Sequence, residues 1–257
     1  MTTALKRATL VVALPALLFA LWWFTSAGST NFFLPPLSKI VESFGTLWLG
    51  PRFFTDIVPS VGRLLLGYAI AVVVGVSLGT VLGLNARVRQ AAEPVLEFFR
   101  AIPPPALVPI FLLVIGIGDE TKLVVIATGA VWPILLNTVE GVRGYDRVLS
   151  DTSATFGIRG WRRLSEFILP GALPNIVAGM RTGLSIAIIL MVISEMFAPT
   201  TGLGASIILA QRSFAIPDMW SGVLVLGLIG FALAMLFRLF ERRVLGWYEG
   251  LKGLERG

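Results

Sequence analysis

The chain has 257 residues, of which 56% are hydrophobic and 14% are charged, and its formal net charge at neutral pH is +6. A soluble protein of this length needs far more charge to cover its surface, so the composition favours a single all-α integral membrane domain spanning residues 1–257. The sequence contains no Cys and no His, which excludes disulfides and the usual Cys/His zinc sites.

Six apolar segments approach or reach the roughly 20 residues that a helix needs to cross a bilayer. They are predicted at residues 8–24, 64–84, 101–117, 123–138, 176–197 and 220–237. The third is short and is interrupted by prolines from Pro103 to Pro109. Because such breaks are tolerated where protein surrounds the backbone, we expect this segment inside the bundle.

The first apolar segment has some features of a secretory signal. Lys6 and Arg7 precede it, and small residues follow near residues 26–29. The apolar stretch is long for a signal, however, and no clear small-x-small cleavage site follows closely. We therefore expect an uncleaved first span.

The distribution of Lys and Arg predicts the orientation. If the N-terminus is cytoplasmic, sixteen of the 21 basic residues lie on the inner side. Cytoplasmic loops carry such an excess, so both termini are expected in the cytoplasm, and the positive charge is explained without nucleic acid.

Residues 37–48 are expected to form a short amphipathic helix on the outer side, at the membrane surface or against the bundle. Its apolar face consists of Leu37, Ile40, Val41, Phe44, Leu47 and Trp48. Its polar face consists of Ser38, Glu42, Ser43 and Thr46.

A row of small residues lies on one face of the second span, where Gly75, Gly79 and Gly83 recur every four residues. Small residues let two helix backbones approach closely in a membrane. The row therefore predicts helix packing, with a sliding surface in a moving transporter as the alternative.

Ionisable residues within spans are costly and often functional. Glu195 is either a gate or a residue at the outer end of its helix, and we add Asn137, Met191 and Ser194 as candidate path residues. For Arg181, we prefer contact with lipid phosphate or pairing with an acid to contact with the cargo.

The loop between the fourth and fifth spans is the most informative stretch. Asp151 or a nearby Ser is suited to capping a short helix, and Gly157 and Gly160 allow a turn. An apolar stripe then runs from Trp161 to Ile168, and Pro170 and Pro174 are expected to stop it before the fifth span. The alternative is an interfacial helix covering the base of the bundle.

This loop resembles the signature of binding-protein-dependent ABC importer permeases, which is Glu-Ala-Ala, three residues, Gly, nine residues and Ile-x-Leu-Pro. Gly157, Leu169 and Pro170 match it, whereas the start is relaxed to Asp151-Thr-Ser and Phe167 replaces Ile. The resemblance implies a coupling helix that docks on an ATPase subunit. The coupling residues it implies are Asp151, Ser153, Ala154, Phe156, Gly157, Ile158, Arg162, Leu169 and Pro170.

Other segments resemble the nitrate, sulfonate and taurine branch of this type I family. They begin at Leu34, Ser60, Arg100, Gly116, Glu195 and Gly202. The resemblance from about Phe32 onward implies the six-span type I permease fold with a periplasmic-side amphipathic helix and a cytoplasmic coupling helix, in the bacterial inner membrane.

The resemblance also implies the partners, which are a second permease subunit, expected to be identical, two ATPase subunits and an extracytoplasmic solute-binding protein. No Gly-Lys dipeptide occurs, so a phosphate-binding loop is excluded. ATP and Mg²⁺ are therefore expected on the partner, with no cofactor or metal in this chain and no enzymatic activity of its own.

The branch favours a small anion of the sulfonate, taurine, nitrate or bicarbonate type as the cargo, with a thiamine or pyrimidine precursor as the alternative. An ion-coupled carrier is disfavoured because, outside Glu195, the spans hold few titratable groups. A membrane enzyme would need converging nucleophiles, bases or metal ligands, and the sequence shows no such set.

Overall fold

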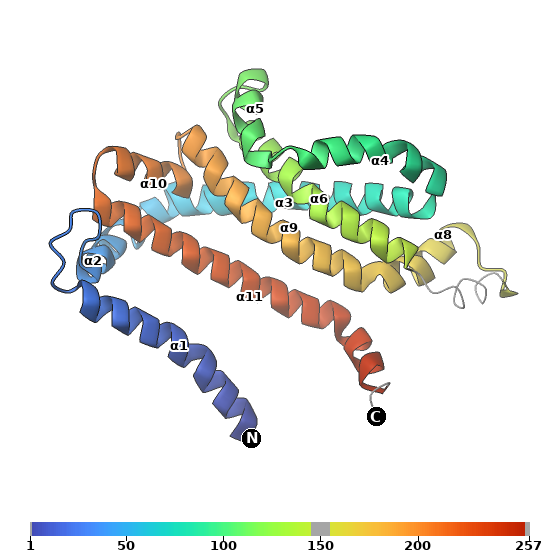
Figure 1. Ribbon diagram of the computed structural model, residues 1–257, viewed down its shortest axis with the longest axis horizontal. Helices are drawn as coiled ribbons and strands as arrows, with labels where there is room; N and C mark the ends of the chain where they lie inside the picture. The colour runs from blue at the N-terminus through green and yellow to red at the C-terminus, as the bar shows by residue number, and fades with distance from the viewer. Residues whose placement is uncertain (1, 145–154, 255–257) are drawn as a thin grey trace.

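The computed structural model describes residues 2–144 and 155–254, and within these ranges it contains helices and no strands. It confirms the all-α fold class. The molecule is an elongated bundle in which three long helices lie side by side and shorter helices gather at the two ends and along one side (Figure 1).

The centre of the bundle consists of α3 (Val58–Leu84), α6 (Asp119–Arg143) and α9 (Leu169–Phe197). α6 packs against α3 on one side and α9 on the other. Their shared core includes Leu64, Ile126, Ile134 and Leu190, all fully or almost fully buried. Within α6, the buried residues Ile126, Ala130 and Ile134 recur every four positions, as expected for the buried face of a helix.

Two of these helices are extended by a π-helical turn. η1 (Phe53–Ile57) precedes α3, while α8 (Gly160–Arg163) and η3 (Leu164–Ile168) precede α9. The helix is continuous from Gly160 to Phe197, so the prediction that Pro170 and Pro174 stop it is wrong. Both prolines lie within this continuous helix, and Pro170 follows the π-helical turn η3 by two residues.

The end of the bundle at the left of Figure 1 is built by α2 (Leu37–Trp48), α10 (Leu203–Arg212) and the start of α11 (Ile216–Leu254). The predicted amphipathic helix is confirmed as α2, and it packs against α11. Trp48 is buried there and donates a hydrogen bond from Nε1 to Ser221 Oγ at 2.9 Å. Ser43, predicted on the exposed face, is buried because it donates to Asp218 at 2.7 Å.

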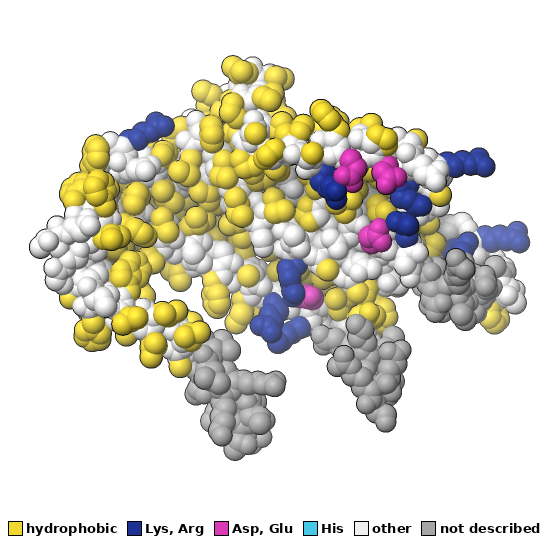
Figure 2. Space-filling model, in the orientation of Figure 1, with side chains coloured by type: hydrophobic (Ala, Val, Ile, Leu, Met, Phe, Trp, Pro, Cys, Tyr) yellow, Lys and Arg dark blue, Asp and Glu magenta, His cyan; other side chains and the backbone are white. Residues whose placement is uncertain are grey.

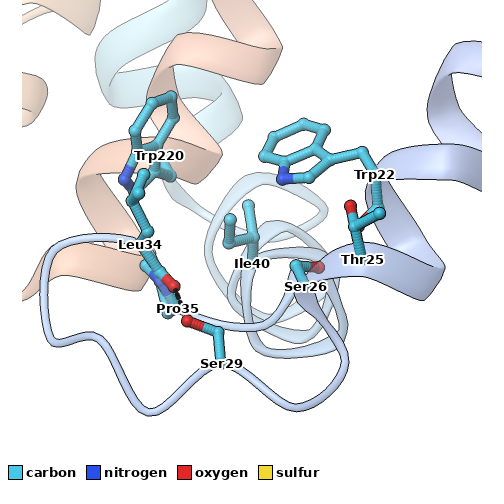
Figure 3. A pocket seen from close by; sticks show the side chains of 8 residues that line it. All are labelled: Trp22, Thr25, Ser26, Ser29, Leu34, Pro35, Ile40 and Trp220. Carbon is cyan, nitrogen blue, oxygen red and sulfur yellow. Dashed lines mark hydrogen bonds between the residues drawn. The ribbon is translucent and has the colours of Figure 1, made fainter.

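α1 (Thr2–Ser26) leaves this end at an angle to the bundle. Where it meets α2 and α11, a cavity of about 230 Å³ lies between Trp22 and Trp220, whose rings are 6.2 Å apart (Figure 3). The backbone N–H of Leu37 donates to Ser26 Oγ at 3.0 Å. These contacts fix the end of α1, while Leu14, Leu17 and Leu18 remain exposed.

The third predicted span differs most from expectation. Instead of one helix over residues 101–117, α4 (Ala86–Ala101) is followed by η2 (Pro104–Leu107) and α5 (Val108–Val114), bent by 83°. The prolines before α5 cause the break because they remove backbone donors and restrict the preceding residues. The expected place inside the bundle is wrong for the single chain, since Leu113 is 88% exposed.

The other predicted spans each fall inside one helix. Four helical stretches are long and apolar enough to cross a membrane: Phe53–Leu84, Asp119–Arg143, Gly160–Phe197 and Ile216–Val244. The bent α4–α5 pair adds a fifth candidate, and Ala13–Ser26 is a shorter apolar helix. Six spans therefore stays a prediction.

Candidate functional site

The glycine row of α3 lies directly against α6. A Cβ placed on Gly79 would be 2.6 Å from Thr138 Cβ and 2.8 Å from the carbonyl oxygen of Leu135. Gly75 and Gly83 meet Ile134 and Val142 in the same way. The row packs α3 and α6 together within one chain, so it does not form an open surface.

A cluster of charged and polar side chains lies where α3, α6, α9 and α10 meet, at the α10 end of the bundle. Arg63 of α3 is its centre, donating from Nη1 to Glu195 at 2.8 Å and from Nε to Asp119 at 2.8 Å. Arg63 also donates from Nη2 to Thr201 Oγ1 at 2.8 Å. One guanidinium therefore joins α3 to both neighbouring helices and to the turn after α9.

Glu195 is completely buried, and its carboxylate is fully surrounded by donors. Besides Arg63, Ser60 donates from its hydroxyl at 2.8 Å, and Gly204 donates its backbone N–H at 3.0 Å. A side chain at Gly202, whose φ is +117°, would collide with the same carboxylate. Paired and hydrogen-bonded in this way, the buried charge holds the α9–α10 turn in place.

Lys122 and Asp56 extend the cluster at its two sides. Lys122 is only 1% exposed and donates from Nζ to Thr200 Oγ1 at 3.0 Å. Asp56 accepts from the hydroxyl of Ser206 of α10 at 2.9 Å. We refer to Asp56, Ser60, Arg63, Asp119, Lys122, Glu195 and Thr201 as the outer cluster.

Of the four predicted path residues, Glu195 belongs to the outer cluster. Glu195, Met191 and Ser194 are all buried within this single chain, so none of them faces open space. Ser194 donates its hydroxyl to the carbonyl of Met191 at 2.9 Å. Asn137 is partly buried and donates to the carbonyl of Pro133 at 2.8 Å.

The exposed face of α9 carries a different set of residues, which the sequence analysis did not select. Asn175, Thr182 and Ser185 are exposed and lie at spacings of seven and three residues, on one side of the helix. In Figure 1, α9 runs between α11 and α6. The signal was the helical spacing of these three polar residues within an apolar span, which a search restricted to charged residues does not detect.

The predicted coupling segment lies at the opposite end, beside α8. Asp151, Ser153 and Ala154 fall outside the described residues. The predicted turn is present, with φ of +70° at Gly157 and +60° at Gly160. Ile158 is half-buried, and Arg162 pairs with Glu166 at 3.0 Å.

One part of this segment packs against the bundle, and another part is exposed. Ile168 is buried, and Leu169 packs against its cluster, which includes Val142 at the end of α6. Phe156 and Trp161, in contrast, are 76% and 75% exposed. Pro170 follows at the start of α9, so α8 and η3 continue directly into a helix of the bundle.

Comparisons with known proteins agree with these features. The sequence pattern of binding-protein-dependent transport system inner membrane components matches residues 71–246. The chain is 30% identical to the taurine transport system permease protein of Escherichia coli (strain K12), over 95% of this chain and 91% of the relative. It is also 30% identical to a putative aliphatic sulfonates transport permease protein of Bacillus subtilis (strain 168), over 93% and 88%.

A third relative is the bicarbonate transport system permease protein of Synechococcus elongatus, 30% identical over 88% of this chain and 86% of that protein. Among solved structures, the fold is similar to a chain of the inward-facing MetNI methionine ABC transporter, with a TM-score of 0.62 and 19% identity. The similarity covers 74% of this chain and 94% of that chain, and at this identity it shows the fold alone.

Proposed function

This chain belongs to the family of binding-protein-dependent transport system inner membrane components, and from that premise we propose that two copies of it line the path of an ATP-driven importer for a small anion. The permease role in an ABC importer follows from the family and the relatives. The cargo class is inferred from three relatives named for taurine, aliphatic sulfonates and bicarbonate, which all carry an anionic group.

The observation that carries the proposed path is the polar stripe of α9, formed by Asn175 and Thr182 with Ser185 at its edge beside α11. Thr182 and Ser185 donate their hydroxyls to the carbonyl oxygens of Ala178 and Arg181 at 3.2 and 3.5 Å, but each hydroxyl oxygen can still accept hydrogen bonds, which lipid tails do not donate. The exposed side of α11 is instead purely apolar around Phe231 and Met235, as expected for lipid contact. The α9 stripe therefore suits a hydrated path between subunits.

The second subunit is proposed to be an identical chain. α5 contacts α6 and α9, yet its Leu113 and Val114 are 88% and 78% exposed. An exposed apolar surface of this kind is typical of a protein interface. Pairing through α5 would bury these side chains.

The ATPase subunits are proposed to bind at Phe156 and Trp161, on the side that we assign to the cytoplasm together with both termini. Large exposed aromatic side chains are the residues that most often dominate protein interfaces. ATP and Mg²⁺ would be held by the ATPase, since this chain has no Gly-Lys dipeptide. The solute-binding protein would then dock at the α10 end.

An ion-coupled carrier is a poorer interpretation of the same structure. Such a carrier needs a titratable group that alternates between the two sides of the membrane. Glu195 does not meet this need, because Arg63, Ser60 and Gly204 all donate to its carboxylate in a fully buried site.

Copurification tests the proposal. The tagged chain, expressed with its partners and extracted in detergent, should retain an ATPase whose vanadate-sensitive activity rises when a liganded solute-binding protein is added. The complex should contain two copies of this chain by native mass spectrometry. A chain that purifies alone and moves solute in liposomes under an ion gradient, without ATP, would contradict the importer.

The path and cargo are tested in proteoliposomes containing the whole complex. Thr182→Leu should reduce taurine or bicarbonate uptake at least tenfold without loss of ATPase copurification, because it replaces a path hydroxyl with an apolar branch. Leu236→Ala, on the exposed apolar side of α11, is the control. Uptake of a thiamine precursor but of no anion would assign a different cargo.

A further inference from the structure

A groove of about 450 Å³ lies between α9 and α11, beside the polar stripe and toward the α8 end of the bundle. Leu184, Ile188 and Phe237 form its apolar walls, and Gly230 and Ala234 leave space on the α11 side. Arg181, Ser185 and Arg238 supply its polar atoms. The groove is therefore apolar along much of its length and cationic where Arg181 and Arg238 lie.

The basic residues lie at the depth of the inner membrane surface. Arg238 follows Ile216, the first residue of α11, by 22 residues (216 to 238), or about 33 Å along a helix. The hydrocarbon core is about 30 Å thick. Arg181 starts deeper in the bundle, but its guanidinium reaches Glu241, three residues beyond Arg238. Both guanidinium groups can therefore reach the headgroup layer.

The charge at this end of the groove is unbalanced. Glu241 pairs with Arg181, while within the described part of the chain Arg238 has no ion pair. Arg242 lies one helical turn further along α11 and is exposed. Figure 2 shows basic side chains gathered around an acidic one on this part of the surface. Three arginines against one carboxylate leave a net positive charge that attracts an anionic group.

We propose that this groove binds one anionic phospholipid, with the phosphate at Arg238 and Arg181 and an acyl chain along Leu184, Ile188 and Phe237. A lipid fits both halves of the groove, since it joins a negative headgroup to an apolar chain. A small soluble anion would leave the apolar walls unused. The inner leaflet is assigned from the proposed orientation, whereas the site itself depends on neither the cargo nor the ATPase.

Native mass spectrometry of the detergent-purified complex tests this site, using phosphatidylglycerol and phosphatidylcholine as probes. The wild type should bind phosphatidylglycerol at least fivefold more tightly than phosphatidylcholine. Arg238→Gln should remove most of this preference, because one arginine near a membrane surface contributes about fivefold. Arg238 is chosen over Arg181 so that the pair with Glu241 stays intact.

A second variant tests the apolar half without changing the charge. Gly230→Leu fills the groove, and the new Cβ meets no atom of this chain within 4 Å, so folding should be preserved. It should also weaken phosphatidylglycerol binding at least fivefold. Gly246→Leu on the same helix and Arg212→Gln on α10 are the matched controls, and both should behave like the wild type.

Three results would overturn the site. They are equal binding of the two lipids, loss of the preference in Arg238→Gln but not in Gly230→Leu, and displacement of phosphatidylglycerol by millimolar inorganic phosphate. The last would assign a site for a free anion. Because these measurements need no transport, their failure is distinguishable from a failure of the proposed importer, which copurification and uptake report.

Discussion

The two ends of the bundle differ in the side chains that mark them, which are paired buried charges at one end and exposed aromatic rings at the other. At the α10 end, the outer cluster pairs Arg63 with Glu195 and Asp119 inside one chain. At the α8 end, Phe156 and Trp161 are left 76% and 75% exposed. The charges of the first end are paired within the single chain, whereas the two aromatic side chains of the second end are, in the proposed complex, covered by the ATPase.

The difference follows from the free energy of each kind of side chain when it has no partner. A buried charge without a partner is unfavourable in every state of the protein, so the chain has to provide the partner itself. An exposed aromatic ring costs little in water and gains much when another protein covers it. The α10 end is therefore the rigid end, and the α8 end is the one through which force from ATP hydrolysis would enter.

Glu195→Ala should have the largest effect on stability, because it destabilises the α10 end. It removes the buried carboxylate to which Arg63 and Ser60 donate and leaves Arg63 only the exposed Asp119 as an ion-pair partner; the loss of one partner in a buried pair costs about 3–5 kcal/mol. We expect a sharp fall in the melting temperature of the purified protein and in the yield of folded chain.

Asp119→Asn is the matched control, because it removes a charge from the same cluster at a position where the side chain is 62% exposed. Exposed ion pairs contribute about 0–1 kcal/mol. Equal destabilisation by the two variants would mean that burial does not distinguish these carboxylates and that the α10 end is not rigid for the reason given.

Gly79→Leu should come next, because it separates the two helices that connect the ends. Its Cβ would meet Thr138 at 2.6 Å, and overpacking of this kind costs typically about 1–3 kcal/mol. Gly227→Leu, with no atom within 4 Å of the new Cβ, is the control. A melting temperature unchanged in Gly79→Leu would show that α3 and α6 do not depend on close backbone contact.

Features set by local chemistry could be predicted from the sequence. The amphipathic period predicted α2, the apolar runs predicted α3, α6, α9 and α11, and the glycines predicted the turn at Gly157. Features that depend on partners distant in sequence could not. Ser43 looked solvent-exposed, but it is covered because Asp218 lies opposite it.

The candidate site was harder to predict for the same reason. Glu195 was correctly seen as unusual, but its donors at Ser60, Arg63 and Gly204 come from separate segments, so its complete burial could not be inferred. Pro170 looked like a helix stop because the preceding π turn was not predictable. The α4–α5 segment was placed inside the bundle because a single chain's sequence does not distinguish burial by its own helices from burial by a second subunit.

Gly157→Ala should have the smallest effect on stability and a selective effect on the open end. A non-glycine residue in the left-handed region costs about 1–2 kcal/mol, here confined to an exposed turn with φ of +70°. We expect the melting temperature to be unchanged and the affinity for the ATPase to fall roughly fivefold or more.

Gly157→Asn sharpens this result, because Asn tolerates the left-handed region. It should retain more of the ATPase binding than Gly157→Ala does. If the two variants behave alike, the conformation of the turn does not determine docking.

The most direct test of the contrast between the two ends is a paired measurement on the double variant Phe156→Ala/Trp161→Ala. Melting temperature and ATPase copurification would be recorded from the same detergent preparation, with Glu195→Ala alongside. The account predicts a double variant that melts like the wild type but loses at least nine-tenths of its bound ATPase. A double variant that keeps its ATPase, or that is as unstable as Glu195→Ala, would contradict the assignment of this end to the ATPase.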